Sequence, residues 1–297
     1  MRGLQAGRKQ GLVSRKEAGP ASEVMAEPSH DAGANPGDYG EVEAPVEDGP
    51  LVCERSNFDA LESFYVAGEG NEVFLEKIAE IKRRYVATRC VRGDGNCFYR
   101  AIMFCLFERC IGVPEEARKL AAKLETFYSE GICGNGEGCL GYETVAIEMF
   151  YCECKEVLEP LLKEGVDVEI ERARLLEAFC DYAKSNGIVV FARLICSCYM
   201  QQNEMLYSAF LEFEGLTVRE FALREVEPLG KEVEQLQIVA TTQALDAPLR
   251  VVYLDRSSGG LNEHLLPEDD PPPGVSRLDI LYRPGHYDIL YPAPPAP

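Results

Sequence analysis

The spacing of apolar residues predicts helices through the middle of the chain. Between residues 71 and 85 an apolar side chain recurs every three or four positions, which places these side chains on one face of a helix. Residues 98–110 are apolar almost throughout and predict a buried helix. The same reasoning predicts further helices over residues 114–131, 142–163, 169–184, 188–200 and 217–226.

Local signals set the ends of several predicted helices. Pro114 fits the first turn of a helix, where its missing N–H is not needed. Thr217, with Glu220 three residues later, forms a capping box. The pair Asn186-Gly187 predicts the end of the helix that starts at residue 169. The following run, 188–200, is compatible with a buried helix or a strand, and we favour the helix.

The C-terminal part of the chain changes to a strand pattern. Residues 248–255 (PLRVVYLD) and 278–283 (LDILYR) are rich in β-branched and aromatic residues. Residues 286–291 (HYDILY) follow a Pro-Gly turn, which predicts a hairpin. Residues 268–274 are acidic and proline-rich, which predicts a loop. We expect His264 to lie in the same loop region. We therefore expect an α+β fold with a small central β-sheet flanked by helices.

The first fifty residues differ from the rest in composition. They hold 8 Gly, 5 Pro and a single aromatic residue, so they cannot bury enough apolar area to offset the entropy of ordering. We expect residues 1–50 to be a disordered tail and residues 51–292 to be the globular domain. The tail is either a solubilising leader or an arm that orders on a partner. It lacks the apolar run of a secretory signal.

Charge and cysteine content narrow the class of protein. The formal net charge of −20 argues against binding to nucleic acid or to an anionic membrane surface, and no run of 18 uncharged apolar residues predicts a membrane span. Twelve cysteines scattered through apolar runs, Cys180 among them, fit a reduced protein, so we expect the cytoplasm and, as a second location, the nucleus. A set of four cysteines has a spacing atypical of zinc sites, and we expect thiols and no metal there: Cys133, Cys139, Cys152 and Cys154.

Two of the three histidines lie in segments that cannot hold a catalytic group, which leaves His286. Asp288 is two residues further along a predicted strand, so both side chains project from the same face. A carboxylate beside an imidazole fixes its tautomer and stabilises the imidazolium. On these residues alone, a capping histidine next to an ordinary surface aspartate is the better explanation of the pattern.

A nucleophile to match this histidine precedes the helix at residues 98–110. The glycine-rich run Arg92-Gly-Asp-Gly-Asn-Cys97 places Cys97 at a helix N-terminus, where backbone N–H groups and the helix dipole favour a thiolate. The same N–H groups, in the turn from Asp94 to Cys97, could stabilise an oxyanion. A buried thiol with no reactivity is the alternative. Together, the turn before Cys97 and the pair His286 and Asp288 favour a Cys–His–Asp site for acyl transfer.

Several segments resemble one family. Residues 94–101 (DGNCFYRA) resemble the catalytic signature of the ovarian-tumour (OTU) deubiquitinases, with a continuation like that of the otubain branch. Residues 283–291 (RPGHYDILY) resemble the otubain C-terminal motif. These two motifs lie 189 residues apart in the order of the family. Residues 217–228 and 251–255 also resemble otubain segments.

The resemblance implies a papain-like cysteine protease that cleaves the isopeptide bond after the C-terminus of ubiquitin. Cys97 would be the nucleophile, His286 the general base and Asp288 the residue that orients His286. Asp94 would be listed with these catalytic residues and would shape an oxyanion hole formed with Gly95, Asn96 and Cys97. The resemblance implies no cofactor. It implies polyubiquitin as substrate, with a preference for lysine-forty-eight linkages, and ubiquitin-conjugating enzymes as further partners.

Two departures from the family leave alternatives open. Residues 1–50 match no otubain arm, and residues 131–141 (GICGNGEGCLG) form a Gly- and Cys-rich stretch in a region that matches only in its helical pattern. One alternative is an otubain fold that binds ubiquitin or a conjugating enzyme without turnover. Another is a papain-like enzyme with a different substrate.

Overall fold

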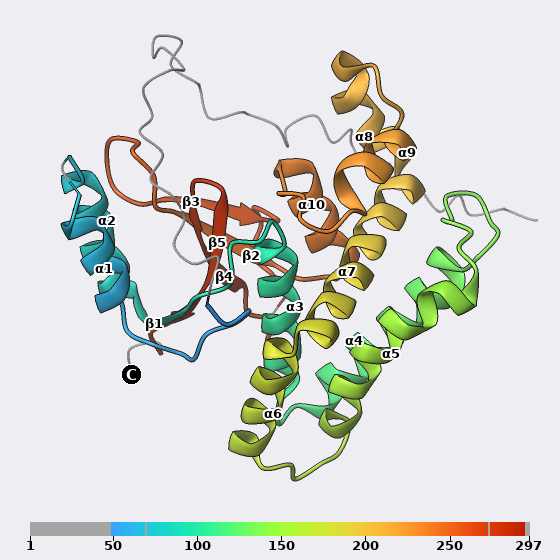
Figure 1. Ribbon diagram of the computed structural model, residues 1–297, viewed down its shortest axis with the longest axis horizontal. Coiled ribbons are helices and arrows are strands. Elements are labelled where there is room, and N and C mark those ends of the chain that lie inside the picture. Colours follow the sequence, from blue (N-terminus) through green and yellow to red (C-terminus); the bar gives the residue numbers. More distant parts are fainter. Residues whose placement is uncertain (1–48, 69, 273, 295–297) are drawn as a thin grey trace, which may run out of the picture. The chain divides into compact units, whose positions relative to one another are not determined.

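The structure is a computed structural model, and it describes residues 49–68, 70–272 and 274–294 (Figure 1). The predicted disordered tail, apart from Gly49 and Pro50, lies outside these residues. The helices are α1 (Asp59–Val66), α2 (Glu72–Arg84), α3 (Cys97–Cys110), α4 (Pro114–Thr126), α5 (Thr144–Leu161), α6 (Val168–Cys180), α7 (Tyr182–Gln202), α8 (Glu204–Leu211), α9 (Val218–Phe221) and α10 (Gln235–Ala244). Short irregular helical turns cover Phe127–Ile132, Glu212–Glu214 and Ala222–Val226.

The described strands form one five-stranded sheet in the order β1-β5-β4-β2-β3. They are β1 (Tyr85–Arg89), β2 (Leu249–Tyr253), β3 (Asn262–Leu266), β4 (Leu278–Arg283) and β5 (His286–Pro292). β2 and β4 are parallel, and the other neighbours are antiparallel. The early strand β1 therefore pairs with the late strand β5, which brings the segment before α3 against the C-terminal hairpin.

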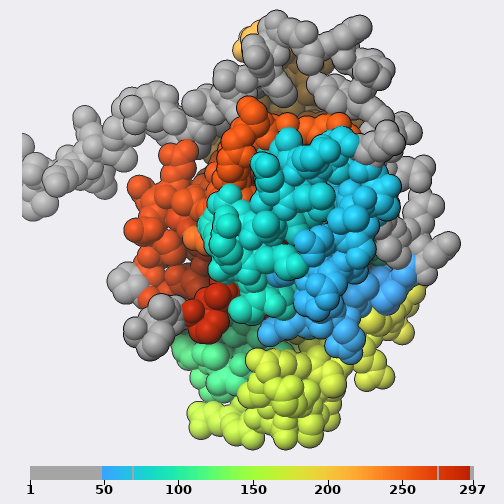
Figure 2. Space-filling view, turned by 90° about the vertical axis from the view of Figure 1, so that its left-hand side faces the viewer, coloured from blue at the N-terminus to red at the C-terminus, as the bar shows by residue number. Residues whose placement is uncertain are grey.

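Helices lie beside the sheet, and the predicted α+β class is confirmed (Figure 1). α3 packs against β5, and α7 packs against α3, α5 and α10. α2 contacts β1 and α1, and the blue and cyan part of the chain that contains them lies on the face shown in Figure 2. α3 is buried along nearly its whole length, because it lies between β5 of the sheet and the helices α4, α6 and α7. This central position holds its N-terminus firmly.

The predicted helix end at Asn186-Gly187 is wrong. The break lies earlier, at Asp181, which caps α7 by accepting a hydrogen bond from the Lys184 backbone N–H at 2.8 Å. α7 then runs through Gly187. A Cβ atom at this position would lie 3.0 Å from the Glu153 side chain on α5. Gly187 thus allows α5 and α7 to approach closely and does not end a helix. The expected helix over 188–200 is confirmed as part of α7.

Other predicted elements are confirmed with small differences. The 217–226 helix begins with the expected capping box and continues after Phe221 as a π-helical turn. The strands around Pro284-Gly285 form the expected hairpin. His264, however, lies in strand β3 and not in a loop, and β1 was missed because it follows α2 with no turn between them. Cys180 is exposed, whereas Cys105, Cys110 and Cys196 are buried.

The helical core contains a cluster of aromatic rings that is suited to a test of stability. Phe179 is fully buried, and its ring packs edge-on against Phe104 at a centroid distance of 5.2 Å. Phe179→Ala should lower the free energy of unfolding by about 3–5 kcal/mol, since it leaves a cavity in a packed core. Phe213 is 98% exposed, and Phe213→Ala should change this free energy by less than about 0.5 kcal/mol. Urea unfolding of both variants checks the prediction, and equal losses would contradict it.

Candidate active site

Cys97 is the first residue of α3, as predicted, and is 5% exposed. The chain reaches this position through Gly95, whose φ of +72° is unfavourable for any residue with a side chain. A Cβ atom on Gly95 would lie 2.3 Å from the Gly230 carbonyl oxygen, so the two backbones could not approach as they do. Glycine at position 95 thus sets the position of the sulfur at the N-terminal end of a rigid helix.

The hairpin β4–β5 supplies His286 and Asp288, which lie on the same face as the strand alternation predicts. His286 is fully buried, and its Nε2 atom lies 2.9 Å from Asp288 Oδ1. The same oxygen accepts a hydrogen bond from the Val91 backbone N–H at 3.0 Å, and Oδ2 accepts one from Arg283 at 2.6 Å. The Asp288 carboxylate is therefore buried and saturated with donors.

These contacts set the protonation of both groups. Burial opposes the charge on Asp288, but the Arg283 and His286 cations and the Val91 N–H outweigh it and lower the pKa of Asp288 to about 2. Burial likewise opposes the imidazolium of His286. The hydrogen bond to Asp288 and the Cys97 thiol outweigh it, and raise the pKa of His286 to about 9. At neutral pH the pair is therefore an aspartate and an imidazolium.

The structure brings Cys97 and His286 together. Because Nε2 is engaged by Asp288, the second ring nitrogen, Nδ1, is the one available to the thiol. The thiol is close enough to raise the pKa of the ring. In the described part of the chain, Nδ1 forms no hydrogen bond. The sulfur of Cys97 and the imidazole of His286 are thus neighbours.

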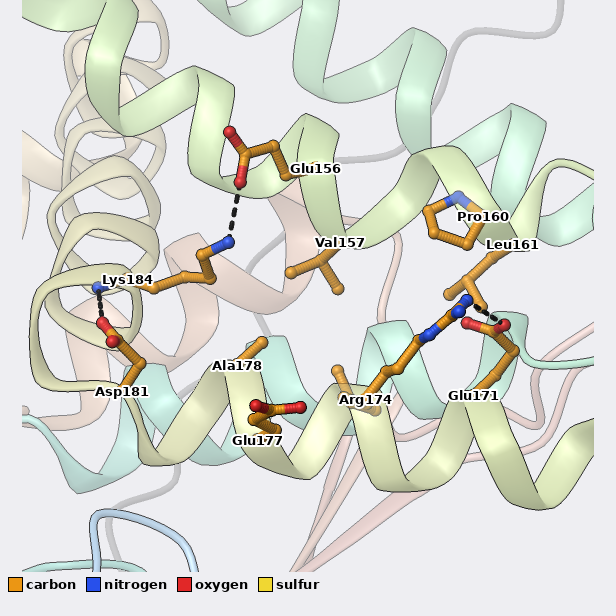
Figure 3. Close-up of a pocket in the computed structure, with 11 residues that line it drawn as sticks. Glu156, Val157, Pro160, Leu161, Glu171, Arg174, Glu177, Ala178, Asp181 and Lys184 are labelled. Carbon is orange, nitrogen blue, oxygen red and sulfur yellow. Dashed lines mark hydrogen bonds and ion pairs between the residues drawn. The ribbon is translucent and has the colours of Figure 1, made fainter.

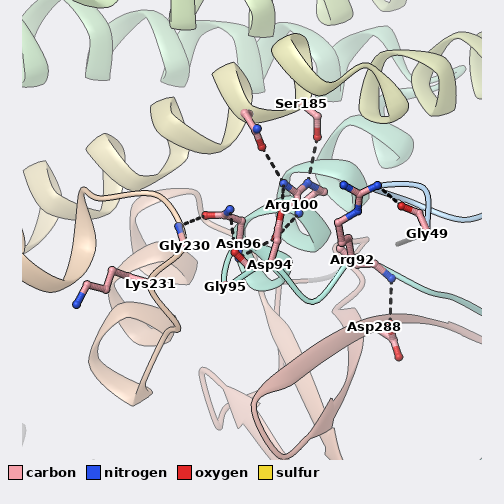
Figure 4. A network of polar contacts seen from close by, with 12 residues as sticks. Gly49, Arg92, Asp94, Gly95, Asn96, Arg100, Ser185, Gly230, Lys231 and Asp288 are labelled. Atoms are coloured by element: carbon pink, nitrogen blue, oxygen red, sulfur yellow. Dashed lines mark hydrogen bonds and ion pairs between the residues drawn. The ribbon is translucent and has the colours of Figure 1, made fainter. Parts of the chain in front are cut away.

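Asp94 shapes the turn before Cys97 and does not reach the imidazole. Its two carboxylate oxygens accept hydrogen bonds from both terminal nitrogens of Arg100, at 2.8 and 2.9 Å (Figure 4). Oδ1 also accepts from the Asn96 backbone N–H at 3.0 Å. This engagement differs from the predicted role of Asn96 as an oxyanion donor, because its N–H is already used within the turn. Despite burial, the Arg100 charge lowers the pKa of Asp94.

Arg100 and Arg193 are buried arginines that hold this turn through hydrogen bonds. The sequence alone predicted no role for either. Arg100 donates to Ser185 and Asn186 of α7 as well as to Asp94. Arg193, also on α7, donates through one nitrogen to the Gly95 carbonyl at 2.8 Å and to the Asn96 side chain at 2.8 Å. The only sequence signal for Arg193 was a single charge inside an apolar helix, which suggests a buried partner for it.

Arg283 was missed for a different reason. It was included in a strand motif, but its pairing with Asp288 follows only from the hairpin register. In that register Arg283 lies opposite His286, so the strand alternation places all three side chains on one face. The period-two argument that linked His286 to Asp288 could have identified Arg283 had it been carried across the turn.

Cys97 lines a cleft of about 280 Å³ between the hairpin and α10. One wall carries the three tyrosine rings Tyr253, Tyr282 and Tyr287, with neighbouring centroids 5.1 and 5.2 Å apart. Glu232 and Glu234 also line the cleft. The cleft therefore presents aromatic rings and acidic side chains beside Cys97.

A second cavity, of about 290 Å³, lies between α5, α6 and α7 (Figure 3). Its charges are largely paired, for example Arg174 with Glu171 at 2.8 Å and Lys184 with Glu156 at 2.7 Å. Its lining contains no cysteine or histidine. None of the residues predicted to be catalytic lines this second cavity, whereas Cys97 lines the first.

The described residues offer no grouping of three or more His, Cys, Asp or Glu side chains that could hold a metal ion. Cys152 and Cys154, considered for zinc, lie on α5, and Cys154 is fully buried. Among the helices described, none has the length and apolarity to cross a membrane.

The sequence matches one family model and several characterised proteins. The family model described as Peptidase C65 Otubain matches residues 44–292. Ubiquitin thioesterase OTUB1 of Homo sapiens is 35% identical over 243 residues, which cover 82% of this chain and 83% of that protein. The ovarian tumor domain-containing deubiquitinating enzyme 1 of Arabidopsis thaliana is 32% identical over 257 residues, covering 82% of each.

Solved structures show the same similarity. A complex described as h/ceOTUB1 with ubiquitin aldehyde and UBC13~Ub matches with a TM-score of 0.71 and 31% identity, covering 83% of this chain and 92% of that chain. A ceOTUB1 complex with ubiquitin aldehyde and UBC13~Ub matches with a TM-score of 0.73 and 30% identity, covering 84% and 96%.

The charge state of His286 can be measured directly, because the chain has only three histidines. An NMR titration of the wild type should show the His286 ring with a midpoint near pH 9. In Asp288→Asn the ring loses its carboxylate partner, burial dominates, and the midpoint should fall below its ordinary value of 6.5. His264, whose pKa is lowered by burial, should titrate below 6.5 in both proteins and serves as the internal control.

The same interaction contributes to stability over a defined pH range. Because the pKa of His286 is raised, its contribution is complete below pH 6.5 and is lost as the pH rises through about 9. Because the pKa of Asp288 is lowered, its contribution is present above pH 3.8 and is lost as the pH falls toward about 2. A wild-type His286 midpoint near 6.5 would contradict both the charge state and this pH range.

Proposed function

The chain belongs to the otubain branch of the ovarian-tumour cysteine deubiquitinases, and we propose that Cys97, His286 and Asp288 carry out its reaction. The reaction is hydrolysis of the isopeptide bond that follows the C-terminus of ubiquitin. The observation that carries the assignment is the buried His286–Asp288 hydrogen bond of 2.9 Å beside the Cys97 thiol. That arrangement supplies a nucleophile, a proton carrier and a group that orients it.

The proposed chemistry follows the charge states. The sulfur of Cys97, as thiolate, attacks the carbonyl carbon, and the imidazolium of His286 is its charge partner. When the carbon–nitrogen bond breaks, His286 gives its proton to the leaving lysine amine, and a thioester to Cys97 remains. The neutral imidazole then takes a proton from water, which attacks the thioester and releases the ubiquitin carboxylate. Asp288 keeps the ring oriented throughout.

The turn before Cys97 is proposed to stabilise the oxyanion formed in each attack. The backbone N–H groups of Gly95 and Cys97 are the proposed donors, since the Asn96 N–H is held by Asp94. Asp94 acts as a positioning residue, because its carboxylate contacts Arg100 and the turn itself. Arg193 holds the other side of this turn through the Gly95 carbonyl.

The proposed substrates and partners are ubiquitin, polyubiquitin chains and ubiquitin-conjugating enzymes. The cleft of about 280 Å³ fits a narrow peptide tail, and the structural neighbours are otubains in complexes with ubiquitin aldehyde and UBC13~Ub or UBCH5B~Ub. For the linkage we propose a preference for lysine-forty-eight chains, as the resemblance implies. The same complexes support a second candidate, in which this chain also binds a charged conjugating enzyme without turnover.

The first test separates catalysis from binding. A ubiquitin probe with a C-terminal electrophile should form a covalent adduct with the wild type, and Cys97→Ser should form none. The same pair of proteins, incubated with ubiquitin dimers of each linkage, should show cleavage by the wild type only, fastest for lysine-forty-eight dimers. A folded wild type that forms no adduct, yet binds a charged conjugating enzyme, would favour the second candidate.

The second test addresses the turn. Gly95→Ala should lower kcat/KM by about 100-fold, because the added Cβ collides with the Gly230 backbone and displaces the sulfur. Gly165→Ala is the matched control: Gly165 has a similar φ of +69°, but nothing lies within 4 Å of a Cβ atom there. It should keep wild-type kcat/KM. A similar loss in both variants would show that the effect is general destabilisation and not displacement of Cys97.

A further inference from the structure

Two cysteines outside the catalytic set, Cys53 and Cys90, face each other across a short antiparallel pairing. The neighbouring residues Val52 and Val91 form an antiparallel bridge, and the Cys53 backbone N–H donates to the Cys90 carbonyl at 2.8 Å. Opposite residues of this hydrogen-bonded kind have Cα atoms about 5.5 Å apart, within the range of about 4.4–6.8 Å that a disulfide spans. The backbone pairing is therefore compatible with a disulfide between the two sulfurs.

The surroundings of the pair favour reaction of one sulfur. Both thiols are free and only half-buried, so a small oxidant can reach them. The hydrogen bond from the Cys90 thiol, with help from the Arg89 charge, lowers the pKa of Cys53 to about 7 against burial and the Asp288 charge. The same contact raises the pKa of Cys90. A thiolate beside a protonated thiol is the arrangement found in redox-active pairs.

Six other thiols in the described chain differ from this pair. Burial raises the pKa of the five thiols at Cys105, Cys110, Cys154, Cys196 and Cys198. Cys180 is exposed, and its sulfur lies 3.2 Å from the Val52 carbonyl oxygen. It is therefore the neighbouring thiol that could form a disulfide with Cys53 or Cys90 instead.

We propose that Cys53 and Cys90 form a site of reversible oxidation that closes to a disulfide on reaction with a hydroperoxide. The Cys53 thiolate attacks the peroxide: a sulfur–oxygen bond forms, the oxygen–oxygen bond breaks, and hydroxide or alkoxide leaves. The Cys90 sulfur then attacks the Cys53 sulfenic acid, the sulfur–sulfur bond forms, and water leaves with the Cys90 proton. The two thiols lose two electrons, and the peroxide gains them.

The pair Cys53 and Cys90 is adjacent in the chain to a residue that contacts Asp288, the proposed catalytic carboxylate. Val91, the residue after Cys90, donates its backbone N–H to Asp288, and Thr88, two residues before Cys90, donates its hydroxyl to the Ile289 carbonyl at 3.0 Å. The disulfide would tie this segment to residues 51–53. Oxidation of Cys53 and Cys90 would therefore restrain the segment that donates a hydrogen bond to Asp288. Cys97 takes no part in the modification.

Disulfide mapping tests the proposal in the full chain with Cys97→Ala, so that oxidation of the catalytic thiol cannot contribute. After treatment with hydrogen peroxide and blocking of free thiols, a digest analysed without reductant should contain a peptide that joins Cys53 to Cys90. Dithiothreitol should remove it. Because this readout needs no activity, it stands or falls independently of the proposed function.

Matched variants in the same background identify the partners. Cys53→Ser and Cys90→Ser should each abolish the linked peptide, and Cys180→Ser should retain it in full. Absence of the linked peptide in the parent protein would overturn the proposal, as would a disulfide that joins either cysteine to Cys180 instead. The parent protein carries native cysteines at 53, 90 and 180, so the decisive mapping does not depend on the folding of the serine variants.

Discussion

A buried carboxylate that must be neutralised organises this molecule. Asp288 is 2% exposed, and removal of its charge from water would be costly without partners. Its partners come from three places: Arg283 across the hairpin turn, His286 two residues away, and the Val91 N–H from the segment before α3. To satisfy Asp288, the chain must therefore pair β4 with β5 and bring the N-terminal strand alongside. The same constraint positions His286, the proposed proton carrier.

A second pair of buried charges positions the sulfur. Arg100 reaches from α3 to the Asp94 carboxylate, and Arg193 reaches from α7 to the Gly95 carbonyl. Both guanidinium groups are fully buried, and each has several acceptors. The turn before Cys97 is therefore held by two buried arginines, one on α3 and one on α7. This arrangement explains how a glycine-rich segment, flexible in isolation, can hold a reactive group in one place.

The sequence predicted features that depend on neighbouring residues. It did not predict contacts between residues that are far apart in the chain. Cys97 could be placed at a helix start from its glycine turn, and His286 and Asp288 on one face from strand alternation. Arg193 could not be assigned, because its acceptors come from residues far away in the chain. The break between the two helices was predicted at Gly187 and lies at Asp181. Glycine at position 187 reflects close packing against Glu153 and not the local end of a helix. Strand β1 needed knowledge of its partner, β5.

The pairing of the first strand with the last has a consequence for biosynthesis. A ribosome that has made Cys97 must add 189 more residues before His286 exists. Until β5 docks beside β1, the nascent chain carries a thiol with no imidazole partner and no assembled cleft. Under the proposed mechanism, the growing polypeptide therefore lacks its proton carrier, His286, until the final hairpin completes the sheet.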